Sequence, residues 1–130
     1  MVYKSASQYV FDLVFKKAKE LGVEVYDLLP DVDAPVTYPF INMGDVITKG
    51  ESLKDDLFQD VDLDVHIWGT RSQRKKVTDL SDELLNKLLP HKLVVKKTNV
   101  RVLADNSTNE ILWHAVLNIY IEYRGKTNGV

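Results

Sequence analysis

The sequence ILWHAVLNIYIEY, residues 111–123, carries the strongest pattern in this 130-residue chain. Apolar side chains occupy every second position, which is typical of a strand that buries one of its two faces. The pattern predicts a strand over residues 111–124 whose apolar face lies deep in the core. The positions of that face are Ile111, Trp113, Ala115, Leu117, Ile119, Ile121 and Tyr123.

A second alternating stretch, DVDLDVHIW, covers residues 60–68. Its apolar positions predict a strand with one buried face, and Trp68 and Gly69 stand where that strand should end. The opposite face of this strand would carry the polar positions, which are Asp60, Asp62, Asp64 and His66.

That acidic row is compatible with binding of a hard cation or with acid–base chemistry. Same-face neighbours on a strand, however, lie roughly 6.5–7 Å apart, because each residue adds about 3.3 Å. The carboxylates would therefore not converge on one ion, and we expect a solvated sheet face without a metal. A surface used in assembly, or the wall of a lumen, is a variant of the same expectation, since a row of like charges is unfavourable for a monomer.

Three further stretches complete the expected sheet. Residues 23–29 and 38–44 are expected to form strands, and Pro39 marks the start or edge of the second. Residues 92–103 form another strand, joined to the last one by a hairpin. The apolar positions of this strand change parity partway along it, so we expect a β-bulge near 96–99.

Two stretches have helical periodicity. Residues 7–21 place apolar side chains at helical spacing, and Gly22 stands at the expected C-terminal position. Residues 72–89 place a leucine-rich stripe on one face and stop at Pro90. The order of elements predicts an α+β fold in which two helices pack on one face of a mainly antiparallel sheet.

Length and composition limit the possible functions. One domain over residues 1–130 fits the length, and the end at 125–130 is expected to be frayed. The formal net charge is −2, whereas nucleic-acid-binding proteins usually carry a basic surplus. Cysteine is absent, which excludes disulfides, thiol catalysis and cysteine-ligated metals. We find neither a membrane span nor a signal peptide, so we expect synthesis and retention in the cytoplasm.

Motifs for catalysis or nucleotide binding are not found in the sequence. The scattered glycines form neither a Walker loop nor a dinucleotide fingerprint, and no GxSxG motif surrounds a serine. His66, His91 and His114 have no zinc-type spacing, so we expect structural roles for them. A basic cluster opens the second helix, where it opposes the helix dipole and either meets an anionic partner or is simply solvated. Its members are Arg71, Arg74, Lys75 and Lys76.

The segment DVITKGESLKDDLFQD, residues 45–60, mixes charged and apolar side chains around Gly50. Connections of this length are usually functional or disordered. We expect a loop that is mobile in the free protein and becomes ordered against a neighbouring subunit or another partner. The alternative is a long hairpin whose apolar residues cover the sheet. The candidate partner-binding or ring-interface residues are Lys49, Leu53, Lys54, Asp55, Asp56, Leu57 and Phe58.

From Val25 onward the sequence resembles the tail completion family of long-tailed bacteriophages, also called tail terminator or head–tail joining proteins. The resemblance rests on VYDLLP at 25–30 followed by PFINMG at 39–44, on VDLDVHIW at 61–68, and on the helix at 75–89. These are patterns of residue type and order without a catalytic signature, so no catalytic residue is transferred.

The resemblance implies a structural virion protein without enzymatic activity or a cofactor. Such a protein forms a ring, usually a hexamer, at the head-proximal end of the tail, where it ends polymerisation of the tail tube protein and faces the head connector protein. Before assembly it would reside in the host cytoplasm. DNA would pass through the lumen without specific binding, and an acidic wall of Asp60, Asp62 and Asp64 would suppress phosphate contacts.

Two other functions fit the same residues. A cytoplasmic protein-binding module or enzyme inhibitor could use the same sheet, and its oligomer size would distinguish it from a ring. A small metal-dependent hydrolase could build a site from Asp62, Asp64 and a histidine. Stabilisation by a metal ion would reveal the second of these.

Overall fold

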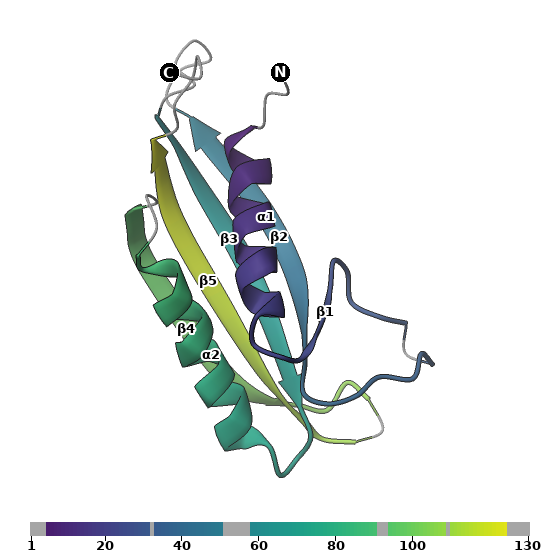
Figure 1. Cartoon of the computed structure of the whole chain (residues 1–130). Helices are drawn as coiled ribbons and strands as arrows, with labels where there is room; N and C mark the ends of the chain where they lie inside the picture. The colour runs from purple at the N-terminus through teal and green to yellow at the C-terminus, as the bar shows by residue number, and fades with distance from the viewer. Residues whose placement is uncertain (1–4, 32, 51–57, 91–93, 109, 125–130) are drawn as a thin grey trace.

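A computed structural model describes residues 5–31, 33–50, 58–90, 94–108 and 110–124, and it places two helices and five strands in them (Figure 1). This confirms the α+β class predicted from the sequence. In chain order the elements are α1 (Ala6–Lys19), β1 (Glu24–Tyr26), β2 (Phe40–Gly50), β3 (Phe58–Gly69), α2 (Arg74–Leu88), β4 (Val94–Asp105) and β5 (Leu112–Arg124).

The five strands form one sheet in the order β1-β2-β3-β5-β4. Neighbouring strands are antiparallel except β1 and β2, which run parallel. β5 lies between β3 and β4, as suits a strand with a deeply buried face. β1 and β4 form the two opposite edges of the sheet.

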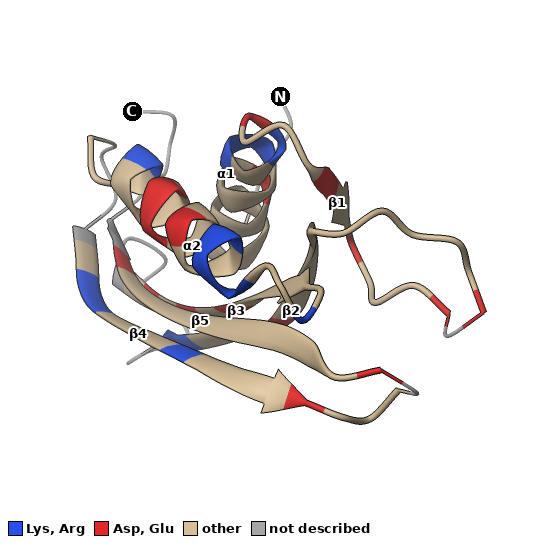
Figure 2. Cartoon of the chain, turned by 90° about the horizontal axis from the view of Figure 1, so that it is seen from below, with Lys and Arg blue, Asp and Glu red and all other residues tan. Residues whose placement is uncertain are grey.

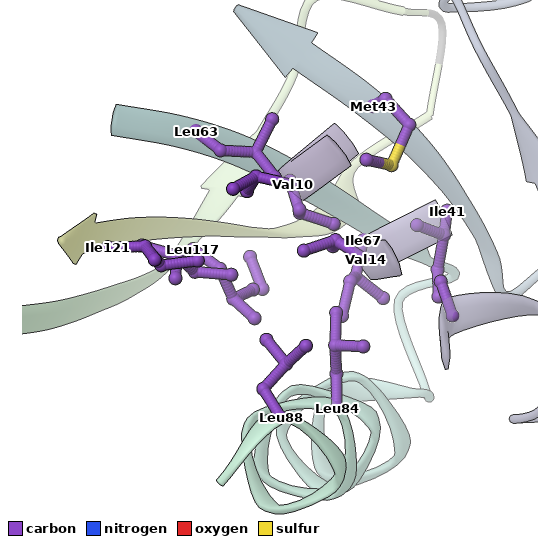
Figure 3. Close-up of a cluster of buried hydrophobic side chains, with 14 of the residues drawn as sticks. Val10, Val14, Ile41, Met43, Leu63, Ile67, Leu84, Leu88, Leu117 and Ile121 are labelled. Carbon is purple, nitrogen blue, oxygen red and sulfur yellow. The ribbon is translucent and has the colours of Figure 1, made fainter. Parts of the chain in front are cut away.

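Both helices cover the same face of the sheet, as the sequence predicted (Figures 1 and 2). In Figure 3, Leu84 and Leu88 point from α2 toward the apolar side chains of the sheet, while Val10 and Val14 come from α1. Burying apolar surface between these two layers is the main source of stability. The sheet contributes alternate residues of its central strands, namely Val61, Leu63, Val65, Ile67, Ala115, Leu117, Ile119 and Ile121.

The ends of α1 follow the sequence signals. The Ser5 hydroxyl accepts a hydrogen bond from the Gln8 backbone N–H at 3.2 Å, which satisfies one donor of the first turn. Beyond the last turn, Gly22 adopts φ +83°, a left-handed conformation that glycine reaches without strain. Within the described residues, neither helix is long and apolar enough to cross a bilayer.

The predicted apolar face of β5 is correct in the middle of the strand and wrong at its beginning. Ile111 is 43% exposed, whereas Leu112 is only 4% exposed. Leu112 packs with Phe40 and Trp68 in a second apolar cluster, separate from the main core. The connection between β1 and β2 places apolar side chains against that cluster, so both faces of the sheet are covered at this end. Trp113 is half-buried rather than deep in the core.

Two β-bulges interrupt the strand pairings. One lies in β4 directly after Val95, at the edge of the stretch where the change of parity predicted it. The other lies in β2 around Gly44, and the sequence analysis did not identify it. A Cβ atom at Gly44 would lie only 2.8 Å from Nε2 of His66, so the close approach of β2 and β3 favours glycine there.

The segment expected to be a mobile loop, residues 45–60, lies partly in two paired strands. β2 continues to Gly50 and β3 begins at Phe58, so residues 45–50 and 58–60 pair as in the long hairpin that was the alternative prediction. The alternation is hard to recognise in the sequence because side chains at this end of β2 are exposed on both faces, including Ile47 at 52%. Residues 51–57, and the end at 125–130, lie outside the described residues.

The burial of β5 leads to a stability test. Leu117→Ala should lower the free energy of unfolding by about 2–5 kcal/mol, because Leu117 is fully buried between sheet and helices. Ile111→Ala is the matched control and should change it by less than about 0.5 kcal/mol, because that side chain is exposed. Urea denaturation of the two variants measures both values. Equal losses would show that the burial along β5 is misassigned.

Candidate functional site

The sheet face that points away from both helices, called the open face here, carries the acidic row and His66 that the sequence analysis singled out. Strand alternation sends the even-numbered side chains of β3 and β5 to this face, because their odd-numbered neighbours fill the core. Asp60, Asp62, Asp64 and His66 therefore share one face, as predicted, and all four are half-buried.

The three acids of β3 are tied to donors on β5. The Asn118 side-chain amide donates to Oδ1 of Asp62 at 2.5 Å and to Oδ1 of Asp64 at 2.8 Å. Both hydrogens of one amide group are thereby used, and they lie between two like charges. The Tyr120 hydroxyl donates to Oδ2 of Asp60 at 2.7 Å, and this hydrogen bond raises the pKa of Tyr120. The acidic row is thus a hydrogen-bonded ladder across two strands.

The geometry of the ladder gives no support to a metal-dependent hydrolase. Among the described residues, no cluster of three or more carboxylates and imidazoles could hold a metal ion. The carboxylates accept hydrogen bonds from Asn118 and Tyr120, which the sequence analysis did not anticipate. His66, a histidine on the same face as Asp62 and Asp64, is hydrogen-bonded to another histidine, His114.

His66 and His114 form a direct pair that joins β3 to β5. Nδ1 of His66 lies 2.8 Å from Nε2 of His114, and the two rings are half-buried. The His114 ring stacks on Trp68 at a centroid distance of 3.7 Å. On its other side, Nδ1 of His114 lies 3.3 Å from Oδ2 of Asp105 at the end of β4. The result is a chain of polar contacts from Asp105 through two imidazoles.

When both imidazole rings are neutral, the donor or acceptor character of each group fixes where the protons lie between Asp105, His114 and His66. A carboxylate only accepts hydrogen bonds, so Nδ1 of His114 carries the proton that faces Asp105. Nε2 of His114 must then accept, and Nδ1 of His66 donates to it. This leaves Nε2 of His66 as an unprotonated nitrogen beside Gly44. Ser107 donates to Asp105 and not to either imidazole, so the arrangement differs from a serine–histidine nucleophile.

Burial sets the protonation of both histidines. Partial removal from water disfavours the charged form and is the main cause that lowers the pKa of each ring. Asp64 and Asp45 act against this at His66, and Asp105 acts against it at His114. For His114, the charge of His66 and that of Arg101 lower the pKa further. The neutral, hydrogen-bonded pair is therefore the stable form near pH 7.

A pocket of about 300 Å³ opens beside the histidine pair. Trp68 forms part of its wall and donates from Nε1 to Oδ1 of the buried Asn42 at 2.8 Å, which fixes the orientation of the indole. The connection after β1 supplies the outer rim, which includes two leucines and an aspartate. The lining residues are Asp27, Leu28, Leu29, Asn42, Met43, Gly44, Asp45, His66, Trp68 and His114.

The candidate partner-binding residues of the β2–β3 hairpin are only partly described. Lys49 is exposed near the end of β2, with its ammonium group 5.9 Å from the centre of the Tyr120 ring. Phe58 begins β3, and its side chain is not described. The remaining candidates, Leu53, Lys54, Asp55, Asp56 and Leu57, lie outside the described residues.

The basic cluster before and within the first turn of α2 is exposed, and part of it has partners within the chain. The Arg74 guanidinium lies 5.2 Å from the centre of the Trp113 ring, and Lys75 pairs with Asp79 at 2.8 Å. The Trp113 Nε1 also donates to the Arg71 carbonyl at 2.8 Å, which ties β5 to the start of α2. These contacts account for Arg74 and Lys75 without an anionic ligand.

Sequence reasoning missed the histidine pair and its pocket. His66 and His114 are separated by 48 positions, and only the β3–β5 register brings them together. The available signal was that both are even-numbered positions of strongly alternating strands, which places them on the same face. Their relative register could not be read from the sequence, because the hairpin and helix between these strands leave it free.

The lowered histidine pKa values predict how stability depends on pH. Unfolding restores both rings to their ordinary pKa of 6.5, so the unfolded chain binds more protons. The contribution of the neutral pair to stability should be full above about pH 7 and should be lost progressively as the pH falls below 6.5 through the lowered pKa values of the folded protein. Urea denaturation over this range should give a shallower slope for His66→Gln combined with His114→Gln. The same slope in both proteins would contradict the assignment.

Comparison with known proteins gives one informative result. The chain matches no protein-family model and no curated protein. Among solved structures it is similar to one described as "Structure of bacteriophage SPP1 gp17 protein", with 21% sequence identity and a TM-score of 0.56. The similarity covers 97% of this chain and 95% of the phage protein. The two proteins therefore share a fold over nearly their whole lengths.

Proposed function

We propose that this chain is a structural protein of a bacteriophage virion that forms a ring at the head-proximal end of the tail. There it would complete or terminate the tail tube and join it to the head connector. The observation that carries the proposal is the fold shared with a bacteriophage protein over 97% of the chain. The resemblance of VYDLLP, PFINMG and VDLDVHIW to the tail completion family points in the same direction.

The surface of the molecule suits a subunit that works by contact. The open face presents half-buried polar side chains held in place by cross-strand hydrogen bonds, which gives a surface of defined shape. The β2–β3 hairpin adds exposed Ile47 and Lys49 at one end. We propose that this hairpin, including the candidates among residues 51–57, contacts the neighbouring subunit, the tail tube protein or the connector.

The acidic ladder is the proposed wall of the DNA passage. Asp60, Asp62 and Asp64 lie in a row on β3, near the middle of the sheet. Like charge would let the phosphate backbone pass without specific binding. Lys49, Lys97 and Arg101 also lie on the open face, on the flanking strands, so the proposed wall is limited to the central strands.

The proposal includes no catalysis and no cofactor. The His66–His114 pair is assigned a structural role, in which it connects β3, β5 and the end of β4. The protein would be in the host cytoplasm before assembly and in the virion afterwards. A binding module or a hydrolase would require a different partner or a metal, and neither is favoured by a specific observation.

The joining function can be tested by electron microscopy. Tails from a phage that lacks this gene should accumulate unattached to heads, because the tube end would have no connector-binding surface. Adding the purified protein should place a ring at one end of each tube and restore attachment to heads. The control is the same protein denatured beforehand. Heads and tails that join equally well without the protein would refute the proposed function.

A further inference from the structure

The two edges of the sheet carry opposite charge. The first edge comprises β1, the connection after it and the start of β2; the second edge is β4. Residues 20–48 contain no lysine or arginine, and residues 92–104 contain no aspartate or glutamate. Figure 2 shows the result, with red segments around β1 and the following connection and blue segments on β4.

The acidic edge is built from exposed carboxylates together with exposed apolar side chains. Leu28 is 77% exposed and Leu29 is 50% exposed, and both stand at the rim of the pocket beside His66. Two leucines so exposed beside a pocket are unusual for a surface that contacts only water. The exposed carboxylates of this edge belong to Glu24, Asp27, Asp31, Asp33 and Asp45.

The basic edge has the complementary character. Lys96, Lys97 and Arg101 are exposed along β4. Val100 is 38% exposed on the opposite face of the same strand, since it pairs with the core residue Leu117. Lys96 lies 3.6 Å from Glu122 of the adjacent strand, which leaves Lys97 and Arg101 as the cations best placed for an outside partner. Lysine on an edge strand disfavours backbone pairing with another chain. A partner would therefore be held by side chains and not by extension of the sheet.

We propose that copies of this chain associate head to tail, with the basic edge of one copy docked on the acidic edge of the next. The two surfaces lie at opposite ends of the strand order, so each copy offers one of each and the contact is heterologous. Such contacts close into a ring when the rotation between copies permits. The pocket, with Asp27 and Asp45 in its lining, receives an arginine or lysine from the neighbour.

This inference deepens the proposed ring by assigning its two contacting surfaces, and its test needs no phage component. The purified chain is examined by sedimentation velocity and native mass spectrometry at low ionic strength, where charge attraction is least screened. One variant reverses the basic edge (Lys97→Glu with Arg101→Glu). The other reverses the acidic edge (Asp27→Lys with Asp31→Lys).

A head-to-tail contact predicts a particular set of results for the wild type, the two variants and their mixture. Each variant alone should associate at least about tenfold more weakly than the wild type, because like charges then face each other. An equimolar mixture of the two should associate again, since both of its interfaces pair opposite charges. Mass spectrometry should show alternating assemblies with equal numbers of the two variants.

Matched controls separate this effect from a change in net charge or folding. Arg71→Glu with Lys76→Glu lowers the net charge as the reversal of the basic edge does, but on the helix-covered side of the molecule. Asp82→Lys with Glu83→Lys raises the net charge as the reversal of the acidic edge does. All four of these side chains are exposed. Both controls should associate like the wild type. Melting temperatures of all variants verify that they are folded.

Chemical cross-linking supplies a second readout, which is possible because the sequence contains no cysteine. Asp31→Cys and Lys97→Cys in one chain, treated with a bifunctional maleimide, should give a ladder of multimers, whereas each single cysteine variant should stay monomeric.

Three results would overturn the inference: a mixture of reversed variants that fails to associate, cross-linking that stops at dimers, or a wild type that remains monomeric at millimolar concentration. The joining experiment could still succeed in any of these cases, so the two proposals can fail separately.

Discussion

The pairing of β3 with β5 is the constraint on which the rest of the structure depends. The two strands are in register over twelve consecutive pairs, from Phe58 with Arg124 to Gly69 with Trp113. Along most of both strands the odd-numbered positions are apolar, so one register places Val61, Leu63, Val65 and Ile67 on the same face as Ala115, Leu117, Ile119 and Ile121. A shift by one residue would send Leu117 and Ile119 to the solvent. The two helices cover the apolar face, and β2 and β4 extend the sheet on either side.

The same register creates the polar chemistry of the open face. It sets Asn118 opposite Asp64 and Tyr120 opposite Asp62, from where they reach the carboxylates of β3. It also sets His114 opposite Trp68 and diagonal to His66, which explains both the ring stacking and the imidazole pair. The open face is thus a consequence of how the core is packed. The polar side chains that are excluded from the core form hydrogen bonds with one another on this face.

A face of this kind connects the fold to the proposed role. The side chains of the open face are oriented by neighbours, whereas the exposed carboxylates and lysines at the sheet edges are free of the core. A ring subunit needs a rigid central surface and two complementary contact surfaces. In this sheet the rigid surface is the middle of the open face, and the contact surfaces are the two edges. The fold is shared with a bacteriophage protein, and the charges on β4 and around β1 mark the two edges proposed to meet in a ring.

The fold class, the two helices, the apolar faces of the central strands and the bulge in β4 were predicted correctly from the sequence. Each of these follows from a periodicity that local residues impose. The sequence analysis also placed Asp60, Asp62, Asp64 and His66 on one face, because strand alternation requires it. The resemblance to tail completion proteins came from the same patterns.

How those faces meet was visible only in the folded chain. The sequence analysis did not recognise residues 45–50 and 58–60 as strand ends, because their exposed side chains lack a clear period. It buried Ile111 because the alternation was extended to a residue before the start of β5. The histidine pair, the hydrogen-bonded acids and the opposed charges of the two edges depend on strand order and register. These are set by long-range packing between segments far apart in the chain, which no local pattern encodes.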